Sequence, residues 1–400
     1  MIDDITLSNI TKRGVKEIIS ETEFVELLNS GRKLRLKMGF DPSRPDIHLG
    51  HVVGLRKLKQ LQDLGHQVIL IVGDWTAQIG DPSGQSITRP MLTHDQVKNN
   101  AESYLKQFFR VVDQEKTEVV WQSEWFGDFK LSDVITLTSK FTVAQFLERD
   151  DFAHRFKEHK PIAITEFLYP LLQAYDSVAI ESDVEFGGTD QMFNLLVGRT
   201  LQQLNGMKPQ QCFLMPILVG TDGVNKMSKS LDNYISLDET PDDMYGKIMS
   251  LPDDCITNYF ELLTDIPLTE LKIMESSLPD NAMNYKKLLA HTITLDFFDK
   301  QIANDSQNNF ENVIQNKGIP ANIPIYNLID NTDNLDIGNI LLASNIVTSN
   351  SELKRLLKQN AVQIINPDGS TEDIRTTTSA INLTSGTVIK IGKRRYLKIV

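Results

Sequence analysis

"LRLKMGFDPSRPDIHLGHVVGLRKLKQLQDLGHQVILIVGD", residues 34–74, is the stretch that decides the fold. Apolar residues alternate along residues 34–40, which predicts a β-strand. After the break at "DPSRPD", residues 47–65 predict a helix with Asp46 as its N-cap and a glycine at its end. "HQVILIVGD" (66–74) then predicts a second, buried strand. A strand, a helix and a strand joined by short loops form the βαβ unit of a parallel sheet.

The same succession recurs where "VEFGG" (184–188) precedes a helix-like stretch and a further strand-like run. Residues 1–235 are therefore predicted to form a Rossmann-like, doubly wound α/β domain with a parallel sheet, interrupted by an inserted helical stretch at about 93–160. The rest of the chain predicts an α-helical domain at 236–320, a linker at 321–336 and a small α+β domain at 337–400.

The composition is that of an ordinary globular protein, with 40% hydrophobic and 24% charged residues and no apolar run of membrane-spanning length. The N-terminus "MIDDITLSN" has the pattern of neither a signal peptide nor a transit peptide. Cys212 and Cys255 lack the spacing of metal ligands. We therefore expect reduced cysteines, a cytoplasmic protein and no protein-bound metal or organic cofactor.

The net charge of −12 hides an asymmetry, because residues 351–400 hold nine Lys/Arg against four Asp/Glu. A basic end on an acidic body predicts a polyanion that is bound at this end alone. A solvated charged surface is the alternative interpretation.

"HLGH" (48–51) places His48 and His51 on one face at the start of the predicted helix. A helix N-terminus suits phosphate, and imidazoles there can donate hydrogen bonds to a phosphoryl group that is being transferred. Gly50 leaves room for a base or ribose. Two exposed helical histidines are the alternative, and the tetrapeptide alone is a weak signal.

"KMSKS" (226–230) is a more specific pattern, in a loop that follows "VGTDG". Lys226 and Lys229 can close over the β- and γ-phosphates of a nucleotide, whereas ordinary loop surface is the alternative. Together the two stretches resemble the paired HIGH and KMSKS signatures of class I aminoacyl-tRNA synthetases. In that family the loop residues Met227, Ser228 and Ser230 would also border ATP.

"TEFLYPLLQAYDSV" (165–178) carries Tyr169, Gln173 and Asp176 as one narrow polar stripe on an otherwise apolar helix. The apolar arc is too wide for one buried face, so the stripe is predicted to face an internal pocket and not solvent. A buried carboxylate needs a hydrogen-bond donor, and a phenolic hydroxyl would serve.

With this stripe, the chain resembles the tyrosyl-tRNA synthetases along nearly its whole length. The matching stretches are "GFDPSRPDIHLGH", "GDPSG" (80–84), "LQAYD", "GGTDQ" and "KMSKS". The resemblance implies that Asp176 takes the substrate hydroxyl, with the other tyrosine contacts at Tyr169, Gln173, Asp81 and Gln191. It places the nucleotide side at Gly39, Asp41, Ser43, Gly188 and Asp190, and Ser43 among the catalytic donors.

Two departures from the family are notable. The commonest form has a tyrosine beside the substrate phenol where this strand carries Lys37, which we therefore include among the tyrosine-site residues. "LKMGFDP" looks closer to the second bacterial branch of the family. The loop after "GDPSG" usually has a lysine or arginine where this chain has Gln85, while Arg89 keeps one catalytic cation there.

The tail resembles an S4 RNA-binding module in "SELKRLLKQNAVQIINPDG" (351–369). Asn360 stands where the family often has glycine, and asparagine also tolerates a left-handed helix end. Two basic patches are predicted to contact tRNA phosphates. They comprise Lys354, Arg355 and Lys358 in the helix, and Lys393, Arg394 and Arg395 near the C-terminus.

The resemblance implies a tyrosine–tRNA ligase that uses ATP with Mg²⁺, L-tyrosine and tRNA(Tyr), acts as a homodimer and does not bind membranes. The tryptophan-specific relative is the nearest alternative, and a non-catalytic RNA-binding protein that kept a synthetase fold is the second. The S4-like tail and the polar stripe disfavour the first, and the intact phosphate signatures disfavour the second.

Overall fold

The computed structural model describes residues 2–43, 46–83, 92–315, 323–328, 337–376, 383–392 and 395–400. The chain forms two compact units, Met1–Asn304 and Asp305–Val400. The finer predicted division of the first unit at residue 235 stays a prediction.

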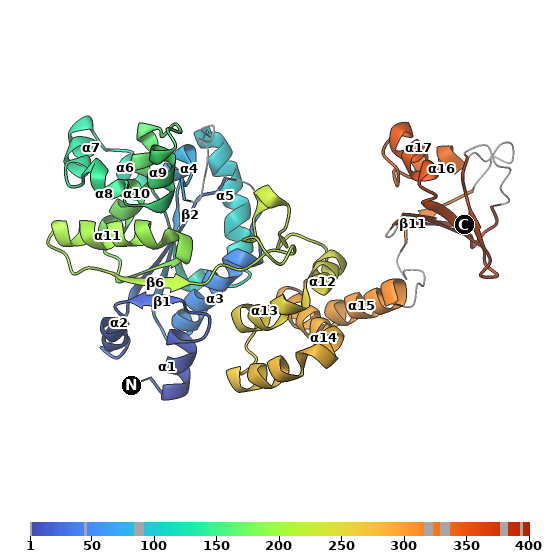
Figure 1. The fold of residues 1–400 in the computed structure, drawn as a ribbon, viewed down its shortest axis with the longest axis horizontal. Coiled ribbons are helices and arrows are strands. Elements are labelled where there is room, and N and C mark those ends of the chain that lie inside the picture. Colours follow the sequence, from blue (N-terminus) through green and yellow to red (C-terminus); the bar gives the residue numbers. More distant parts are fainter. Residues whose placement is uncertain are drawn as a thin grey trace. The chain divides into compact units, whose positions relative to one another are not determined.

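A six-stranded sheet in the order β1-β6-β5-β2-β3-β4 forms the centre of the first unit (Figure 1). Its strands are β1 (Glu17–Ile19), β2 (Arg35–Phe40), β3 (Gln67–Val72), β4 (Thr117–Trp121), β5 (Val184–Gly188) and β6 (Gln211–Met215). All neighbouring pairs are parallel except β1 with β6. The predicted Rossmann-like parallel sheet is confirmed, and β1 adds an antiparallel edge.

The chain runs from β2 outward to β4 and then returns to β5 on the other side of β2. Open α/β sheets bind ligands at such a switch point, beyond the carboxyl ends of the strands. Helices cover both faces. Met38 of β2 faces Gly54 of α3 (Leu49–Asp63), whereas Lys37 faces α10 (Ile164–Ala179) on the opposite side.

The predicted helical insertion at 93–160 is wrong in one part, because β4 lies inside it and pairs with β3. Five residues between polar neighbours give too short an apolar pattern to reveal a strand, and only its long-range pairing does so. The other helices of this stretch and of the N-terminal region are α1 (Asp4–Thr11), α2 (Glu21–Leu28), α4 (Thr76–Ile79), α5 (His94–Phe108), α6 (Ser123–Phe126), α7 (Leu131–Thr138), α8 (Val143–Phe146) and α9 (Asp150–Lys157).

Beyond β6 the chain becomes helical, as predicted. The helices there are α12 (Pro241–Met249), α13 (Ile256–Leu263), α14 (Leu268–Phe297) and α15 (Lys300–Phe310), whereas α11 (Met192–Leu204) connects β5 to β6. Arg13 joins the end of α13 to the N-terminal region by donating to the carbonyls of Phe260 and Thr264. Among the helices that the structure describes, none has both the length and the apolar character that crossing a bilayer requires.

The second unit holds a five-stranded sheet in the order β7-β11-β10-β8-β9. Its elements are β7 (Ile325–Tyr326), α16 (Ile337–Ala343), α17 (Asn350–Lys358), β8 (Val362–Ile365), β9 (Thr371–Asp373), β10 (Val388–Ile391) and β11 (Arg395–Ile399). The predicted linker 321–336 needs a correction, because β7 pairs in parallel with β11. Asn360 has a φ of 51°, the left-handed helix end predicted for it.

Candidate active site

A cavity of about 740 Å³ opens beyond the carboxyl ends of β2, β3 and β5. Its volume lies within the range of about 300–1,000 Å³ that is usual for small-molecule sites. The predicted site residues that line it are Gly39, Asp41, Ser43, His48, Gly50, His51, Asp81, Tyr169, Gln173, Asp176, Gly188, Asp190, Gln191, Lys226, Met227, Ser228, Lys229 and Ser230. Residues of β2, the start of α3, α10 and the loop 226–230 thus meet in one space.

The two histidines cap the start of α3. His48 Nδ1 accepts from the backbone N–H of Gly50 at 3.2 Å, and His51 Nδ1 accepts from the N–H of His48 at 3.3 Å. Because an accepting Nδ1 carries no proton, each neutral ring has its proton on Nε2. His48, and not the predicted Asp46, is therefore the N-cap of α3, because its ring accepts from the N–H of Gly50 in the first turn.

Both imidazoles are uncharged near neutral pH. Burial lowers the pKa of His51 to about 4 and that of His48 further still, and the neighbouring Lys229 adds to both shifts. Gly50 permits this packing, because a Cβ there would lie 2.9 Å from the His48 ring. The pair can therefore donate hydrogen bonds from Nε2 without a change of charge.

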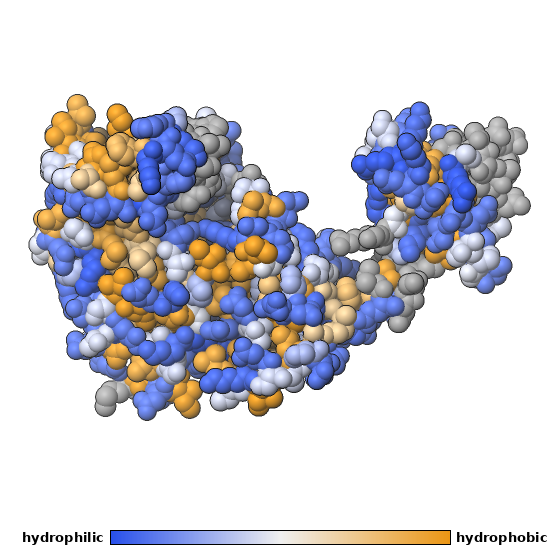
Figure 2. Space-filling model, viewed as in Figure 1, coloured by the Kyte–Doolittle hydropathy of each residue, from blue (hydrophilic) through white to orange (hydrophobic). Residues whose placement is uncertain are grey.

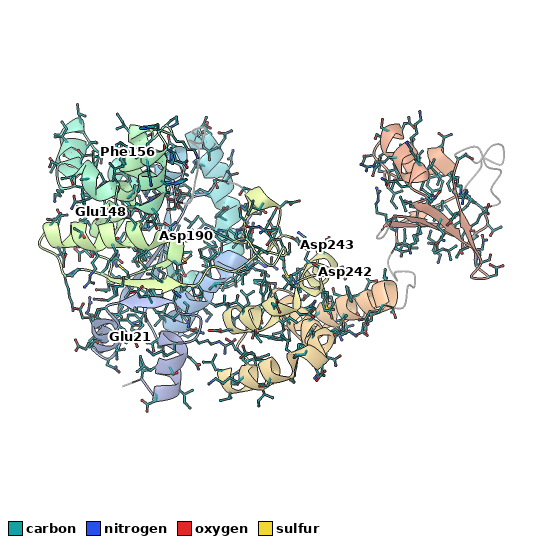
Figure 3. The ribbon with its side chains drawn as sticks, viewed as in Figure 1. Glu21, Glu148, Phe156, Asp190, Asp242 and Asp243 are labelled. Carbon is teal, nitrogen blue, oxygen red and sulfur yellow. The ribbon has the colours of Figure 1, made fainter. Side chains whose placement is uncertain are left out.

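The loop 226–230 brings both lysines to the cavity wall and anchors them. Met227 is buried, and Asn233 fixes the turn by accepting from the N–H of Ser228 at 2.8 Å. Lys226 forms an ion pair with Asp190, which lies on the turn after β5 (Figure 3). The short loop therefore presents two ammonium groups to the cavity.

Lys229 is the more enclosed of the two lysines. Its Nζ lies 3.2 Å from Asp46 Oδ1 and 3.2 Å from the Tyr104 hydroxyl, and 5.0 Å from the centre of that ring. A cation over an aromatic face is attracted to it, so Tyr104 holds the ammonium close to His51.

The stripe on α10 lines the same cavity, as predicted for a stripe that faces an internal pocket. The Tyr169 hydroxyl donates to Asp41 Oδ2 at 2.8 Å, and Thr76 Oγ1 donates to Asp41 Oδ1 at 2.7 Å. Burial raises the pKa of Tyr169 well above 10, so this phenol stays a donor. Asp41 therefore orients Tyr169.

Asp176 is 2% exposed and accepts from Gln122 Nε2, at 3.1 Å to Oδ1 and 2.9 Å to Oδ2. Burial raises the pKa of Asp176 to about 7, while Lys37 and the hydrogen bond from Gln122 oppose that shift. The carboxylate is thus a hydrogen-bond acceptor at a dry wall of the cavity. It suits a ligand that donates an O–H.

Asp81 and Gln191 form a second polar group among the residues that line the cavity. Gln191 Nε2 donates to Asp81 Oδ2 at 2.7 Å, while Asn194 Nδ2 donates to Gln191 Oε1 at 2.9 Å. With Tyr169 and Gln173 nearby in the same cavity, they can bind the ammonium and carboxylate of an amino acid.

Comparisons with known proteins show the family of the chain. Residues 29–315 match the family model of tRNA synthetases class I (W and Y). A tyrosine–tRNA ligase of Dehalococcoides mccartyi (strain CBDB1) is 56% identical over 397 residues, covering 98% of each chain. That of Thermotoga maritima is 49% identical, over 98% of this chain and 96% of its own. The chain belongs to the tyrosyl-tRNA synthetases.

Solved structures of more distant tyrosyl-tRNA synthetases share the fold. The Archaeoglobus fulgidus synthetase, complexed with L-tyrosine, has a TM-score of 0.61 at 23% identity, covering 76% of this chain and 98% of its own. A truncated mitochondrial synthetase of Aspergillus nidulans has a TM-score of 0.63 at 20% identity, covering 76% and 93%.

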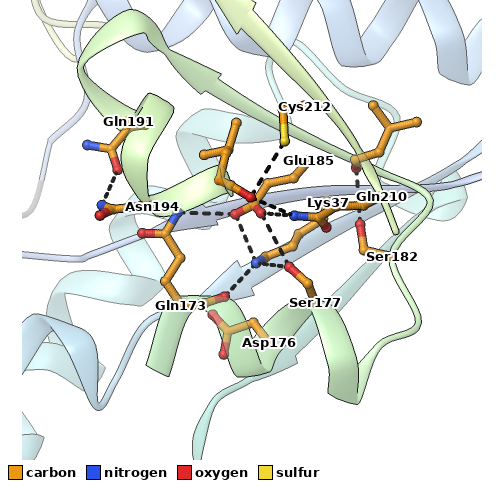
Figure 4. A network of polar contacts seen from close by, with 12 residues as sticks. Lys37, Gln173, Asp176, Ser177, Ser182, Glu185, Gln191, Asn194, Gln210 and Cys212 are labelled. Atoms are coloured by element: carbon orange, nitrogen blue, oxygen red, sulfur yellow. Dashed lines mark hydrogen bonds and ion pairs between the residues drawn. The ribbon is translucent and has the colours of Figure 1, made fainter. Parts of the chain in front are cut away.

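One predicted tyrosine contact of this tyrosyl-tRNA synthetase is not at the cavity. Lys37 is fully buried and does not line the space, since its Nζ lies between the sheet and α10, 2.9 Å from Glu185 Oε1 and 2.7 Å from the carbonyl of Gln173 (Figure 4). A strand of a parallel sheet is buried on both faces, so alternation alone could not tell a lining lysine from a paired one.

The predicted tRNA contacts divide into two groups. Lys354, Arg355 and Lys358 lie exposed on α17. Arg395 instead lies 2.9 Å from Glu352 and donates to the carbonyl of Ile346 at 2.7 Å, so it ties β11 to the start of α17. Arg89, Lys393 and Arg394, like Gln85, lie outside the described residues.

Sequence reasoning missed several residues that shape the cavity. Gln122 and Thr76 orient the two carboxylates, and Asp46 and Tyr104 hold Lys229. Gly73 is also needed, because a Cβ there would lie 2.4 Å from Asp41 Oδ1. None of these residues stands in a periodic pattern, so only the folded structure brings them to the site.

Proposed function

We propose that this chain is a tyrosine–tRNA ligase that activates L-tyrosine with ATP and transfers the tyrosyl group to tRNA(Tyr). One observation carries the proposal. A single cavity is lined by the Asp176 carboxylate and the Tyr169–Asp41 pair, and also by two Nε2–H imidazoles and two lysines. A phenol-bearing amino acid suits the first group of residues, and a polyphosphate suits the second.

In the first step the tyrosine carboxylate attacks the α-phosphate of ATP, the bond to the β-phosphate breaks, and pyrophosphate leaves. No side-chain nucleophile is needed, so catalysis rests on positioning and on donors aimed at developing charge. His48 and His51 supply Nε2–H donors, Lys226 and Lys229 supply ammonium groups, and Ser43 lines the same region. Mg²⁺ enters with ATP, bound through phosphates and water.

In the second step a hydroxyl of the terminal ribose of tRNA attacks the tyrosyl carbonyl, and AMP leaves. Asp176 keeps the phenol in place during both steps. Both cysteines are free and buried, which suits a reducing compartment, so we assign the enzyme to the cytoplasm.

ATP–pyrophosphate exchange measured with each common amino acid tests the proposal. Tyrosine alone should support rapid exchange, followed by charging of tRNA(Tyr). Preferred exchange with tryptophan would assign the chain to the tryptophan-specific alternative. Absence of exchange with every amino acid would favour the non-catalytic RNA-binding protein.

The homodimer is proposed from an apolar surface on the insertion. Large apolar side chains are exposed on α7, α8, α9 and the start of α10, and Figure 2 shows hydrophobic surface over this region. They are Leu131, Ile135, Val143, Phe156 and Ile164, each more than half exposed. Exposed apolar patches of this kind mark protein–protein interfaces, and the occupant that we propose is a second copy of the chain.

Phe156→Glu should convert the dimer to a monomer, because it places a charge in a desolvated interface. Light scattering after size-exclusion chromatography measures the mass. Ile273→Glu, at a similarly exposed residue on α14, should leave the mass unchanged. A monomeric parent protein, or a variant that remains dimeric, would contradict the assignment.

The S4-like role of the second unit rests on the exposed cations of α17. Replacing Lys354, Arg355 and Lys358 with alanine should weaken tRNA(Tyr) binding at least about tenfold and reduce the slope of log affinity against log salt by about 2. A filter-binding titration at several salt concentrations measures both. Lys16, Lys33 and Lys208 replaced together remove the same charge elsewhere, and an equal loss with them would contradict the role.

A further inference from the structure

Lys37 has no contact with the cavity, yet all of its hydrogen-bonding capacity is used. The fully buried Nζ donates to the carbonyl of Gln173 at 2.7 Å and to Ser177 Oγ at 2.7 Å, and lies 2.9 Å from Glu185 Oε1 (Figure 4). An ammonium group has three donors, so each has one partner.

Glu185 is saturated in the same way. It accepts from Gln173 Nε2 at 3.1 Å, from Ser177 Oγ at 3.3 Å and from Gln210 Nε2. Gly198 makes room for this arrangement, because a Cβ there would lie 2.8 Å from Gln210 Nε2 and 3.2 Å from Glu185 Oε2. A buried ion pair adds little to stability over apolar packing, so its presence calls for another reason.

The Lys37–Glu185 pair contacts the same turn of α10 that carries Asp176, the carboxylate proposed to bind the substrate phenol. Gln173 and Ser177, which Lys37 holds, are three residues before and one residue after Asp176 on α10. Figure 4 shows Asp176 on the same turn of the helix as these contacts. The Lys37 ammonium therefore acts electrostatically on two buried carboxylates, those of Asp176 and Glu185.

We propose that Lys37 is a positioning residue for tyrosine specificity. Clamped to Glu185, its ammonium holds residues 173–177 of α10 in place and keeps Asp176 ionised as the acceptor of the substrate phenol. The inference rests on the proposed function, because it assigns a role within the tyrosine site.

The electrostatics of the site agree with this role. Lys37 lowers the pKa of Asp176, Glu185 raises it to a smaller extent, and burial leaves it at about 7. The other groups that face Asp176 are Gln122 and Trp125, which follow β4, and Tyr169 on its own helix. Asp41 and Asp81 line the same cavity from the loops that follow β2 and α4.

The sign of the pH effect follows from the acceptor role. Asp176 accepts a hydrogen bond from the phenol O–H best when it is ionised. The KM for tyrosine should therefore rise about tenfold for each pH unit below the pKa of Asp176. Removing the charge of Glu185 should lower that midpoint. Removing both charges should raise it, since the effect of Lys37 is the larger of the two.

The experiment compares Glu185→Gln with the double variant Lys37→Met/Glu185→Gln. Both conserve side-chain volume, and the double variant avoids leaving an unpaired buried charge. The KM for tyrosine is measured by ATP–pyrophosphate exchange between about pH 5.5 and about pH 8, below the range in which phenols ionise. Near-UV circular dichroism verifies that each variant is folded.

The expected result is a midpoint that moves in opposite directions, downward for Glu185→Gln and upward for the double variant, in each case by about one pH unit or less. The kcat above each midpoint should change little. Ser177→Ala, which removes hydrogen bonds but no charge, should leave the midpoint in place. If Glu185→Gln does not fold, because it leaves the buried Lys37 charge unpaired, the upward shift of the double variant decides alone.

Midpoints that stay fixed or move in the same direction would overturn the role of Lys37. That outcome differs from a failure of the proposed function, in which the unaltered protein would show no tyrosine-dependent exchange at any pH.

Discussion

Lys229→Ala should slow formation of tyrosyl-adenylate by about 10²–10³-fold and leave tyrosine binding without ATP nearly unchanged. Removing one donor aimed at developing charge typically costs this much. The Lys229 ammonium lies beside Asp46 and Tyr104, and the Tyr104 ring lies near His51, whereas Asp176 accepts from Gln122. Single-turnover adenylate formation and equilibrium dialysis of tyrosine measure the two quantities.

Lys208→Ala removes an exposed lysine beyond the end of α11 and serves as the control. It should leave both quantities unchanged. Equal losses of tyrosine affinity and adenylate formation in Lys229→Ala would show that the lysine supports the fold of the site. That result would contradict its role in binding the phosphates of ATP.

Asp176→Ala should abolish most discrimination between tyrosine and phenylalanine. A site built to bind a hydroxyl rejects the analogue that lacks it, because a buried polar group is left unpaired. Tyrosyl-tRNA synthetases are themselves the reference case, with rejection of about 10⁵, which sets the upper limit of the change. We expect kcat/KM for tyrosine to fall by about 10²–10³-fold while that for phenylalanine does not fall.

ATP–pyrophosphate exchange assays with tyrosine and with phenylalanine, at one pH above neutrality, measure the ratio of the two kcat/KM values. Tyr175→Phe is the matched control, since this neighbouring phenol packs against Phe126 and Phe129 in the apolar cluster beside α10. A parallel fall of both kcat/KM values in Asp176→Ala would argue that Asp176 serves only the fold.

Local spacing predicted part of the site. Tyr169, Gln173 and Asp176 recur at the period of a helix, which places them on one side of α10, and all three reach the cavity. The strand–helix–strand stretch 34–74 predicted β2, α3 and β3 because each element is long and has a clear period. Asn360 adopts its left-handed φ for a local reason as well.

Contacts between distant segments were not predictable from such patterns. Gln122 reaches Asp176 across 54 residues of sequence, and Thr76 reaches Asp41 across 35. The pairing of Lys37 with Glu185 has the same origin, since β2 and β5 become neighbours only when the sheet forms. Residue propensity and periodicity describe single helices and strands. They therefore cannot predict which residues of one element orient the side chains of another.

A crystal structure of the enzyme with a non-hydrolysable analogue of tyrosyl-adenylate tests the central claim most directly. We predict the phenol oxygen at about 2.6–2.8 Å from an Asp176 carboxylate oxygen, and the phosphate group within hydrogen-bond reach of Nε2 of His48 or His51. A phenol bound elsewhere, with Asp176 still paired only to Gln122, would contradict the account.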